Sequence, residues 1–541
     1  MSEATDRHNE PAPAAAAAPV SPWGALHVRV FRWLWLATVV NNVGGWMYNA
    51  ASGWLMTSLN PDPFIVSLVQ VANSLPLFVF ALPAGALADM IDKRRFILVL
   101  EILTTVFCTA FALLVAWNRV TPMLLLVFIA LIGTLGAIET PAWQAITPLL
   151  VPKPALSSAI ALNSLGVNIS RVVGPALTGV LILGAGIAAP FWVNAVSNLG
   201  VIFVILAWRT PAAARARTLP PEHFSGAVRA GLRYAHNHGP LRAALVRAVG
   251  FFISASAYWA LLPVLARTQL HGAATLYGVL LGVLGAGAVA GALALPRLKE
   301  HLGSDGLVVA GELGTAVALA LFAVAHAAPL AILACLLAGG SWILVLATLN
   351  VAAQLALPEW VRGRGLAVYA TVFFGTMSLG SALWGFAATR IGLSAAHLTA
   401  AAVALLAIPL TRRWRLQGVG ELDLAPSAHW PAPVLAQPVD ADAGPVLVSI
   451  EYRIDPKDRV AFLAALTRLA RTRRRDGAYS WGVFEDTAHR GRMLETYLVD
   501  SWLEHLRQHE RTTRADRVLE DRVRAFTHEP ARITHYISAA N

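Results

Sequence analysis

The sequence predicts an all-α polytopic membrane protein, with twelve transmembrane helices in two six-helix halves, followed by a C-terminal α+β ferredoxin-like domain. Composition is the first reason: of 541 residues, 57% are hydrophobic and 13% are charged, against about 25% charged in an ordinary soluble domain. The second reason is a series of long apolar segments, and the third is a short pattern that occurs once in each half. One soluble core could not bury so much apolar surface, so the bilayer must cover most of it.

Twelve apolar segments are each long enough to cross a membrane, because a span needs about 20 residues for a hydrocarbon core ~30 Å thick. They lie near residues 31–58, 64–88, 96–117, 122–147, 156–183, 187–208, 243–266, 274–296, 306–326, 330–357, 362–388 and 393–411. The predicted organisation is a flexible cytoplasmic tail at 1–22, a six-helix bundle at 23–208, a cytoplasmic linker at 209–242, a second six-helix bundle at 243–415, a linker at 416–444 and a soluble ferredoxin-like domain at 445–541.

The distribution of Lys and Arg predicts the orientation, since positively charged loops stay in the cytoplasm. The even-numbered connections hold most of the basic residues, whereas the odd-numbered ones hold little beyond Arg119, Arg267 and Arg390. Both termini are therefore expected in the cytoplasm, with the spans in the plasma membrane, the inner membrane of a bacterium. The net charge of +11 is explained by these residues facing anionic lipid, and no nucleic-acid partner is expected.

Two patterns repeat between the halves. The segment from Gly85 to Lys93 reads GALADMIDK and the segment from Gly291 to Lys299 reads GALALPRLK, both closing an apolar run before a basic loop. A second series recurs with the same spacing: Gln144, Pro148, Val151 and Leu156 correspond to Gln354, Pro358, Val361 and Leu366. Such repeats predict two like-oriented halves of a transporter, related by an axis along the membrane normal.

The stretch from Gly85 to Arg95 resembles the loop motif between the second and third helices of the major facilitator superfamily. Gly85, Leu87, Asp89, Lys93 and Arg94 match, Arg95 extends the basic run, and Met90 and Asp92 depart from the pattern. Four further segments are similar to the transmembrane secretion effector branch, which includes enterobactin-exporter-like carriers: Trp54-Leu55, Leu162 to Ser164, Arg171 to Pro175, and Trp360 to Arg364. The resemblance implies export of a small amphipathic molecule, siderophore or drug-like, by alternating access.

The same resemblance implies a gate. In the family the loop acid engages the neighbouring half near its eleventh helix in the outward-open state, so Asp89 is expected to latch onto a helix N-terminus or onto Arg362 or Arg364. The candidate gating residues are Gly85, Asp89, Lys93, Arg94, Arg95, Arg362 and Arg364. The alternative is that these charges only set the topology.

Arg171 lies deep in the fifth predicted span, where a charge costs at least a few kcal/mol unless it is paired or hydrated. Glu139 in the fourth span is the candidate partner, and the pair is either structural or part of a cavity. Polar and aromatic side chains in the first and fifth spans either line that cavity or join helices by hydrogen bonds. The candidate substrate or proton pathway is Asn42, Trp46, Asn49, Glu139, Asn168 and Arg171.

Gly174 and Pro175, with Gly179 after them, resemble the fifth-helix motif of antiporters. Proline frees a carbonyl and bends the helix, and glycine permits close helix contact, so the motif predicts either a helix bend with an antiport role or plain packing. Glu101 and Glu312 occupy corresponding places near the cytoplasmic ends of the third and ninth spans, and proton coupling at either is a further hypothesis.

The C-terminal segment reads as strand 446–453, helix 456–474, strands 479–485 and 492–499, helix 501–524 and strand 533–537. This βαββαβ order is ferredoxin-like and is similar to the antibiotic-biosynthesis-monooxygenase superfamily, whose domains pair, so self-association is expected there. His505 and His509 stand one turn apart, but no third metal ligand is evident.

No nucleotide-binding loop occurs either. We therefore expect no metal, no cofactor, no catalytic residues and no enzyme activity, and we expect protons and a small-molecule substrate as partners. The alternatives are a bifunctional exporter whose tail modifies or captures the cargo, and an importer of the same fold.

Overall fold

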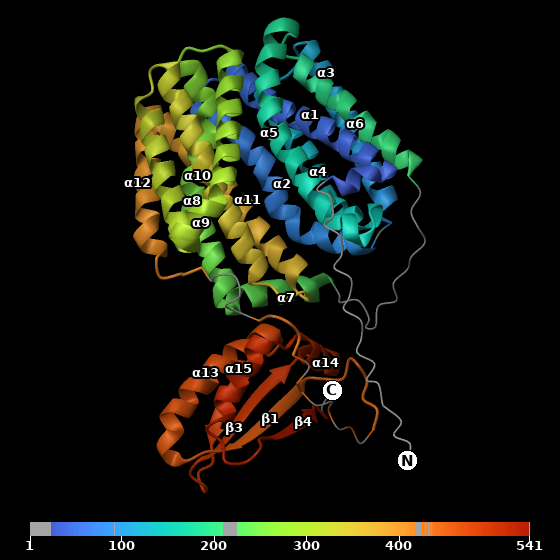
Figure 1. The fold of residues 1–541 in the computed structure, drawn as a ribbon, viewed down its shortest axis with the longest axis vertical. Coiled ribbons are helices and arrows are strands. Elements are labelled where there is room, and N and C mark those ends of the chain that lie inside the picture. The colour runs from blue at the N-terminus through green and yellow to red at the C-terminus, as the bar shows by residue number, and fades with distance from the viewer. Residues whose placement is uncertain are drawn as a thin grey trace, which may run out of the picture.

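The computed structural model describes residues 23–90, 92–208, 224–416, 423–427, 429–430, 433, 435 and 437–539, and it describes the backbone alone for residues 85–90, 145, 148, 149, 153 and 224–227. A bundle of membrane helices stands above a small α+β domain (Figure 1). The first half of the bundle contains α1 (Arg29–Leu59), α2 (Pro63–Met90), α3 (Lys93–Ala116), α4 (Pro122–Leu150), α5 (Leu156–Ala185) and α6 (Ala189–Ala207).

The second half contains α8 (Gly239–Val264), α9 (Ala274–Val324), α10 (Ala328–Leu355), α11 (Arg362–Ile391) and α12 (Leu393–Thr411), and α7 (Phe224–Asn237) precedes it. Ten helices of the described chain are long and apolar enough to cross a membrane, namely α2 to α6 and α8 to α12. The side chains of these helices are mostly apolar and so can face lipid. An α-helix also satisfies its backbone N–H and C=O groups within its own segment, as the hydrocarbon region requires.

Helix α9 contains the two helices expected at 274–296 and 306–326, which meet at a kink. The element covers 51 residues in all, and Gly303 inside it has the non-helical angles φ +65° and ψ −179°. Only glycine adopts this backbone conformation without strain, so the chain leaves the helical path at Gly303 and resumes it. The break falls just after the basic stretch 297–299, close to the predicted connection.

The two halves meet along α2 against α11 and α5 against α9. Hydrogen bonds join the halves at the distal end, formed by residues 57–62, 267–275 and 389–392, which lies away from α7 and the C-terminal domain (Figure 1). There Arg267 donates hydrogen bonds to Thr57 and Ser58, and Thr389 donates to Asp62 at 3.1 Å. These contacts hold the distal end closed.

Glycine makes the contact of α5 with α9 possible. A Cβ atom on Gly179 would lie 2.8 Å from Cα of Thr275 and 3.0 Å from the carbonyl oxygen of Ala274, and both are backbone atoms that cannot rotate away. We therefore expect Gly179→Val to weaken the distal closure by about 1–3 kcal/mol, the usual penalty for overpacking. Hydrogen exchange of the backbone at residues 270–278 should then be faster.

Gly184→Val on the same helix is the matched control, because nothing lies within 4 Å of a Cβ atom there. Equal exchange rates in the two variants would contradict the expectation.

The C-terminal domain is a four-stranded antiparallel sheet with helices on one face. Its elements are β1 (Val446–Arg453), α13 (Arg459–Asp476), β2 (Ser480–Glu485), β3 (Arg492–Val499), α14 (Trp502–Arg511), α15 (Arg514–Arg524) and β4 (Arg532–Ile537). The spatial order is β2-β3-β1-β4, with Val446 opposite Val499 and Ile537. Alternate residues of β1 point into the core. The strand order is the one expected for a ferredoxin-like domain.

One predicted helix of this domain is in fact two. The pattern at 501–524 predicted a single helix, but α14 ends at Arg511 and α15 begins at Arg514. Thr513 caps α15: its side chain accepts from the backbone N–H of Asp516, and the Asp516 side chain accepts from the backbone N–H of Thr513. This capping box stabilises a new helix start and so divides the segment.

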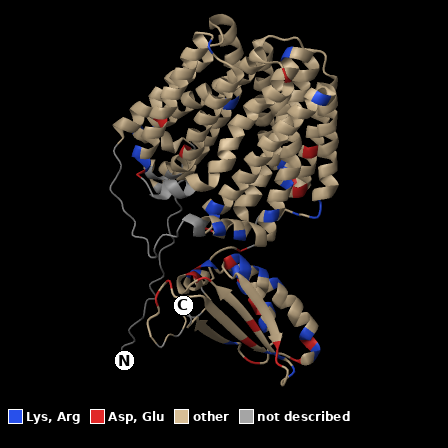
Figure 2. Ribbon diagram, turned by 180° about the vertical axis from the view of Figure 1, so that it is seen from behind, with Lys and Arg blue, Asp and Glu red and all other residues tan. Residues whose placement is uncertain are grey.

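The C-terminal domain docks on α7 and on the segment between α10 and α11. Arg233 of α7 forms a 3.0 Å ion pair with Glu504 of α14 and donates to the carbonyl of Arg475. The guanidinium of Arg511 lies 4.7 Å from the ring centre of Trp360, which precedes α11. Lys and Arg gather at the end of the bundle that faces this domain (Figure 2). The domain is thus attached to the second half of the bundle through charged and aromatic contacts.

Candidate functional site

A cavity of about 330 Å³ lies between the two halves, within the range of small-molecule sites. It is lined from both halves by α1, α2, α5, α8, α9, α10 and α11, and most of the lining is apolar or aromatic. The lining residues are Trp46, Asn49, Ala50, Gly53, Val66, Val69, Gln70, Asn73, Ser74, Leu77, Arg171, Pro175, Trp259, Ala260, Pro263, Tyr277, Leu281, Trp342, Phe373, Phe374 and Met377.

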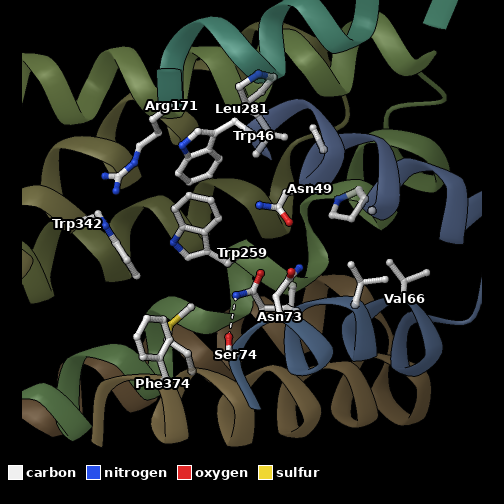
Figure 3. Close-up of a pocket in the computed structure, with 18 of the residues that line it drawn as sticks. Trp46, Asn49, Val66, Asn73, Ser74, Arg171, Trp259, Leu281, Trp342 and Phe374 are labelled. Atoms are coloured by element: carbon white, nitrogen blue, oxygen red, sulfur yellow. Dashed lines mark hydrogen bonds between the residues drawn. The ribbon is translucent and has the colours of Figure 1, made fainter. Parts of the chain in front are cut away.

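Arg171 is the only charged side chain among the described lining residues. Its guanidinium carbon lies 5.3 Å from the ring centre of Trp46, a cation–π distance. Its buried Nε–H has no hydrogen-bond partner in the described part of the chain. Figure 3 shows the guanidinium group extending past Trp46 toward Trp342. A single unpaired cation among aromatic rings suits a ligand with an acidic group and an apolar body.

Further polar groups line the same cavity. The indole N–H groups of Trp259 and Trp342 are buried and have no partner among the described residues. On α2, Gln70 donates to Ser74 at 3.1 Å and Asn73 lies beside them (Figure 3). Sequence reasoning missed these residues, although Gln70, Asn73 and Ser74 stand three and four positions apart in an apolar span, a spacing that puts them on one helix face.

The structure brings together four of the predicted site and bend residues, because Trp46, Asn49, Arg171 and Pro175 all line the cavity. The remaining pathway residues do not line it. Asn42 is half-buried in α1, and Asn168 is exposed and donates to the carbonyl oxygen of Ser164 at 2.8 Å.

Glu139 is not paired with Arg171, the partner considered for it from sequence. Its carboxyl group accepts a 2.8 Å hydrogen bond from the indole of Trp143 and hydrogen-bonds to Glu101 of α3. Arg171 contacts Trp46 instead. The prediction rested on the rise per residue, which gives how deep Arg171 and Glu139 lie in the membrane. Which side chains meet also depends on how each helix is rotated about its own axis.

A cavity between two like-folded halves is the arrangement of a transporter, and comparison with known proteins agrees. The profile described as transmembrane secretion effector matches residues 20–541, nearly the whole chain. The chain belongs to this family. It is a transporter family of the major facilitator superfamily, and so the cavity occupies the place where such proteins bind their substrates.

Similar proteins are named as exporters and transporters of small molecules. The chain is 25% identical over 398 residues to the multidrug efflux pump Tap of Mycolicibacterium fortuitum, covering 72% of this chain and 96% of the pump. It is 26% identical over 296 residues to the enterobactin exporter EntS of Citrobacter koseri, covering 54% and 69%. With the staphyloferrin A transporter of Staphylococcus aureus it shares 23% over 267 residues, covering 48% of this chain and 65% of the relative.

Solved structures show the same fold for the bundle. A POT family transporter in complex with a thioalcohol-conjugated peptide superposes with a TM-score of 0.59 at 12% identity, covering 71% of this chain and 96% of that one. A bacterial homologue of the iron transporter ferroportin, in an inward-facing state, superposes with a TM-score of 0.54 at 15% identity, covering 71% and 98%.

Gly174 and Gly179 both lie where α5 packs closely against another helix, α1 for Gly174 and α9 for Gly179. A Cβ atom on Gly174 would lie 2.6 Å from Cβ of Trp46 and 2.9 Å from the carbonyl oxygen of Val43. Gly174 therefore lets α1 approach α5 and fixes the backbone that carries Trp46 next to Arg171. Pro175 lies inside α5, and the helix continues through it.

The gating candidates fall into two groups. Gly85 and Asp89 lie in α2, but their side chains are outside the described part of the structure. Asp92, which departs from the family motif, caps α3 by accepting from the backbone N–H of Arg95 at 2.8 Å. Arg94 donates to the carbonyl oxygens of Ile205 and Leu206 at the end of α6. This loop is therefore anchored within the first half.

The remaining gating candidates lie at the surface or beside α7. Lys93 is half-buried and Arg95 is exposed at the start of α3. Arg362 is exposed at the start of α11, whereas Arg364 is half-buried, with its Cβ 3.2 Å from where a Cβ of Gly231 would lie. Arg364 thus packs against α7, the helix on which the C-terminal domain docks.

The C-terminal domain brings three histidines together. The Nε2 atoms of His505 and His509 are 3.3 Å apart, and the ring of His535 is 4.6 Å from that of His505. Within the described ranges, no group of three or more His, Cys, Asp or Glu side chains is arranged to hold a metal ion. Burial, with repulsion from His535 and His509, lowers the pKa of His505 to about 3. Burial likewise lowers the pKa of His509 to about 4.

These shifts predict a pH-dependent stability. In the unfolded chain each histidine binds a proton with a pKa near 6.5, whereas in the folded domain it stays neutral to a much lower pH. Protonation therefore favours the unfolded chain, and the stability of the domain falls as the pH drops below about 6.5. Between pH 7 and pH 5 the contribution of His505 should fall by about 2 kcal/mol. Hydrogen exchange of α14 and β4 in the full-length protein measures the loss.

His505→Gln should make that loss smaller, and His489→Gln, at an exposed loop position, is the control. An unchanged pH dependence in His505→Gln would contradict the expectation.

Proposed function

We propose that this protein is a secondary active transporter that exports a small amphipathic molecule, siderophore or drug-like, across the bacterial inner membrane in exchange for protons. The observation that carries the proposal is the cavity between the halves, with Arg171 as its cation and Trp46, Trp259 and Trp342 around it. Aromatic faces accommodate an apolar body, and the guanidinium and indole N–H groups bind acidic or acceptor groups. The names of the relatives support this cargo class.

We also propose twelve spans with both termini in the cytoplasm. Counting α1 as a span and α9 as two spans, divided at Gly303, gives that number. The gathering of Lys and Arg at the end that faces the C-terminal domain (Figure 2) supports a cytoplasmic position for that end. We propose the domain division expected from the sequence as well: a tail at 1–22, bundles at 23–208 and 243–415, linkers at 209–242 and 416–444, and the ferredoxin-like domain at 445–541.

Alternating access would then open the end that is closed here and close the other. The contacts at the distal end, among them Arg267 with Ser58 and Thr389 with Asp62, belong to the closed outer gate. Asp89 with Arg362 or Arg364 would form the inner latch in the opposite state. Gly85 and the basic run Lys93 to Arg95 would position that latch.

We propose a regulatory role for the C-terminal domain, with self-association as a further role, rather than chemistry on the cargo. Its attachment to α7 and Trp360 supports regulation, because α7 packs against α11 and α2, one helix from each half. Deleting residues 443–541 tests this. Transport with an unchanged substrate range would argue against obligatory chemistry in the tail, and loss of transport only for compounds that the tail modifies would favour the bifunctional alternative.

The function itself is tested by uptake of a panel of siderophores and drugs into energised inside-out vesicles. At least one amphipathic compound should accumulate, and collapsing the pH gradient with an uncoupler should abolish the accumulation. Accumulation that survives the uncoupler would overturn the proton coupling, and failure of the whole panel would overturn the proposed cargo class.

A further inference from the structure

Two buried carboxyl groups meet inside the first half, away from the cavity lining. Glu101 of α3 is 3% exposed and Glu139 of α4 is 8% exposed, and the two side chains hydrogen-bond to each other. The indole of Trp143 donates to the Glu139 carboxyl group at 2.8 Å. A hydrogen bond between two carboxyl groups forms only when one of them carries a proton.

No cation neutralises this pair among the described residues. Three basic residues of the first half lie elsewhere: Arg94 donates to the end of α6, Arg95 is exposed at the start of α3, and Arg171 contacts Trp46. The titratable group that faces Glu101 from its own helix is Cys108, and Tyr48 of α1 lies beyond it. Neither carries a positive charge. Two carboxylates in contact without a cation cannot both be ionised at low cost.

The position of the pair suits proton exchange. Glu101 lies eight residues after the start of α3, about 12 Å along the helix axis from the end that faces α7. On the other side, polar groups continue along the interior of the half: Asn194 of α6 donates to the sulfur of Cys108 at 3.2 Å, and Ser197 donates to Asn41 at 3.2 Å. The pair thus lies between one bundle end and a buried polar track.

In the part of the second half that the structure describes, Glu312 has no partner carboxyl group. Glu312, at the place corresponding to Glu101, is fully buried, and both of its carboxyl oxygens lack a hydrogen-bond partner in the described chain. Its charged neighbour is Arg247, which bonds to Asp305 at 3.0 Å and to the carbonyl oxygen of Trp414 at 2.8 Å. Glu312 therefore has no second carboxyl group with which to share a proton, whereas Glu101 has Glu139.

We propose that Glu101 and Glu139 together carry the proton that this transporter exchanges for its cargo, an inference that rests on the proposed proton coupling. The pair gains one proton from one side of the membrane and releases one to the other, with no other change in bonding. Release of the shared proton leaves two negative charges in contact and drives α3 and α4 apart. Helix α3 begins at the loop that carries the predicted gating residues, so this movement reaches the loop. Proton release and helix movement are thereby coupled.

The first test is infrared titration of the purified full-length protein, with the proton as the probe. The carbonyl stretch of protonated carboxyl groups should be present at neutral pH in the wild type and should be reduced in Glu101→Gln and in Glu139→Gln. Glu300→Gln, at an exposed end of the bundle, is the matched control, and Glu312→Gln tests the second half. A band that is lost in Glu312→Gln but kept in both first-half variants would overturn the proposal.

The second test uses the panel compound that the wild type accumulates. In proteoliposomes, both first-half variants should lose accumulation driven by a pH gradient but keep cargo exchange at equal pH, which needs no net proton transfer and also reports correct folding. If both variants accumulated the compound like the wild type, the role of Glu101 and Glu139 would be overturned but the proposed function would stand. A wild type without gradient-driven accumulation would overturn the proposed function instead.

Discussion

Arg171→Ala is expected to lower the transport of acidic compounds roughly ten- to a hundred-fold, because a hydrogen bond to a charged group contributes about 1.5–3 kcal/mol. Arg171 is the only charge among the described residues that line the cavity, and its Nε–H is unpartnered there. A ligand with a carboxylate or phenolate would bind this guanidinium. Neutral compounds, which depend on the aromatic lining, should lose much less. Initial rates of uptake into inside-out vesicles measure both.

The control for this variant is Arg119→Ala, which removes an exposed arginine from the connection between α3 and α4. It should leave both classes of compound unaffected. Equal loss of acidic and neutral compounds in Arg171→Ala would contradict a role in charge recognition and would indicate a general effect on the bundle.

Arg473→Ala should destabilise the C-terminal domain by about 3–5 kcal/mol, the range seen when one partner of a buried ion pair is removed. Arg473 is buried between Glu520, at 2.9 Å, and Glu495, at 3.6 Å, and both carboxylates are almost fully buried. Its guanidinium also lies 4.9 Å from the ring centre of Trp430. The substitution leaves two negative charges without their cation. Hydrogen exchange of β1 and β3 in the full-length protein should accelerate strongly.

Arg468→Ala, on the exposed face of the same helix, is the matched variant and should change exchange little. Similar exchange in Arg473→Ala and Arg468→Ala would show that the buried charges contribute no net stability.

Much of the fold follows from local patterns. Long apolar runs predict membrane helices whatever their partners, and alternation of buried and exposed residues predicts β1 over 446–453, the bounds it has. An error arose where a short local signal divides a longer pattern. Thr513 and Asp516 divide the helical stretch at 501–524 by forming a capping box.

Part of the site was predictable, because some of its residues are polar or aromatic side chains within otherwise apolar spans. Trp46, Asn49 and Arg171 are polar or aromatic side chains in apolar spans, and all three line the cavity. Trp259 and Trp342 were not predictable, because the contribution of the second half depends on how the two bundles pack. The same reason explains Glu139, whose partner is decided by the rotation of α3 against α4 rather than by its depth in the membrane.

The most direct test of the account is substrate-evoked proton release from energised inside-out vesicles. We predict that an acidic amphipathic compound evokes release in the wild type, and that Arg171→Ala and Asp89→Asn, each present and folded in the membrane, both lose it. Release that persists unchanged in both variants, or a wild type that transports the compound without moving protons, would contradict the account.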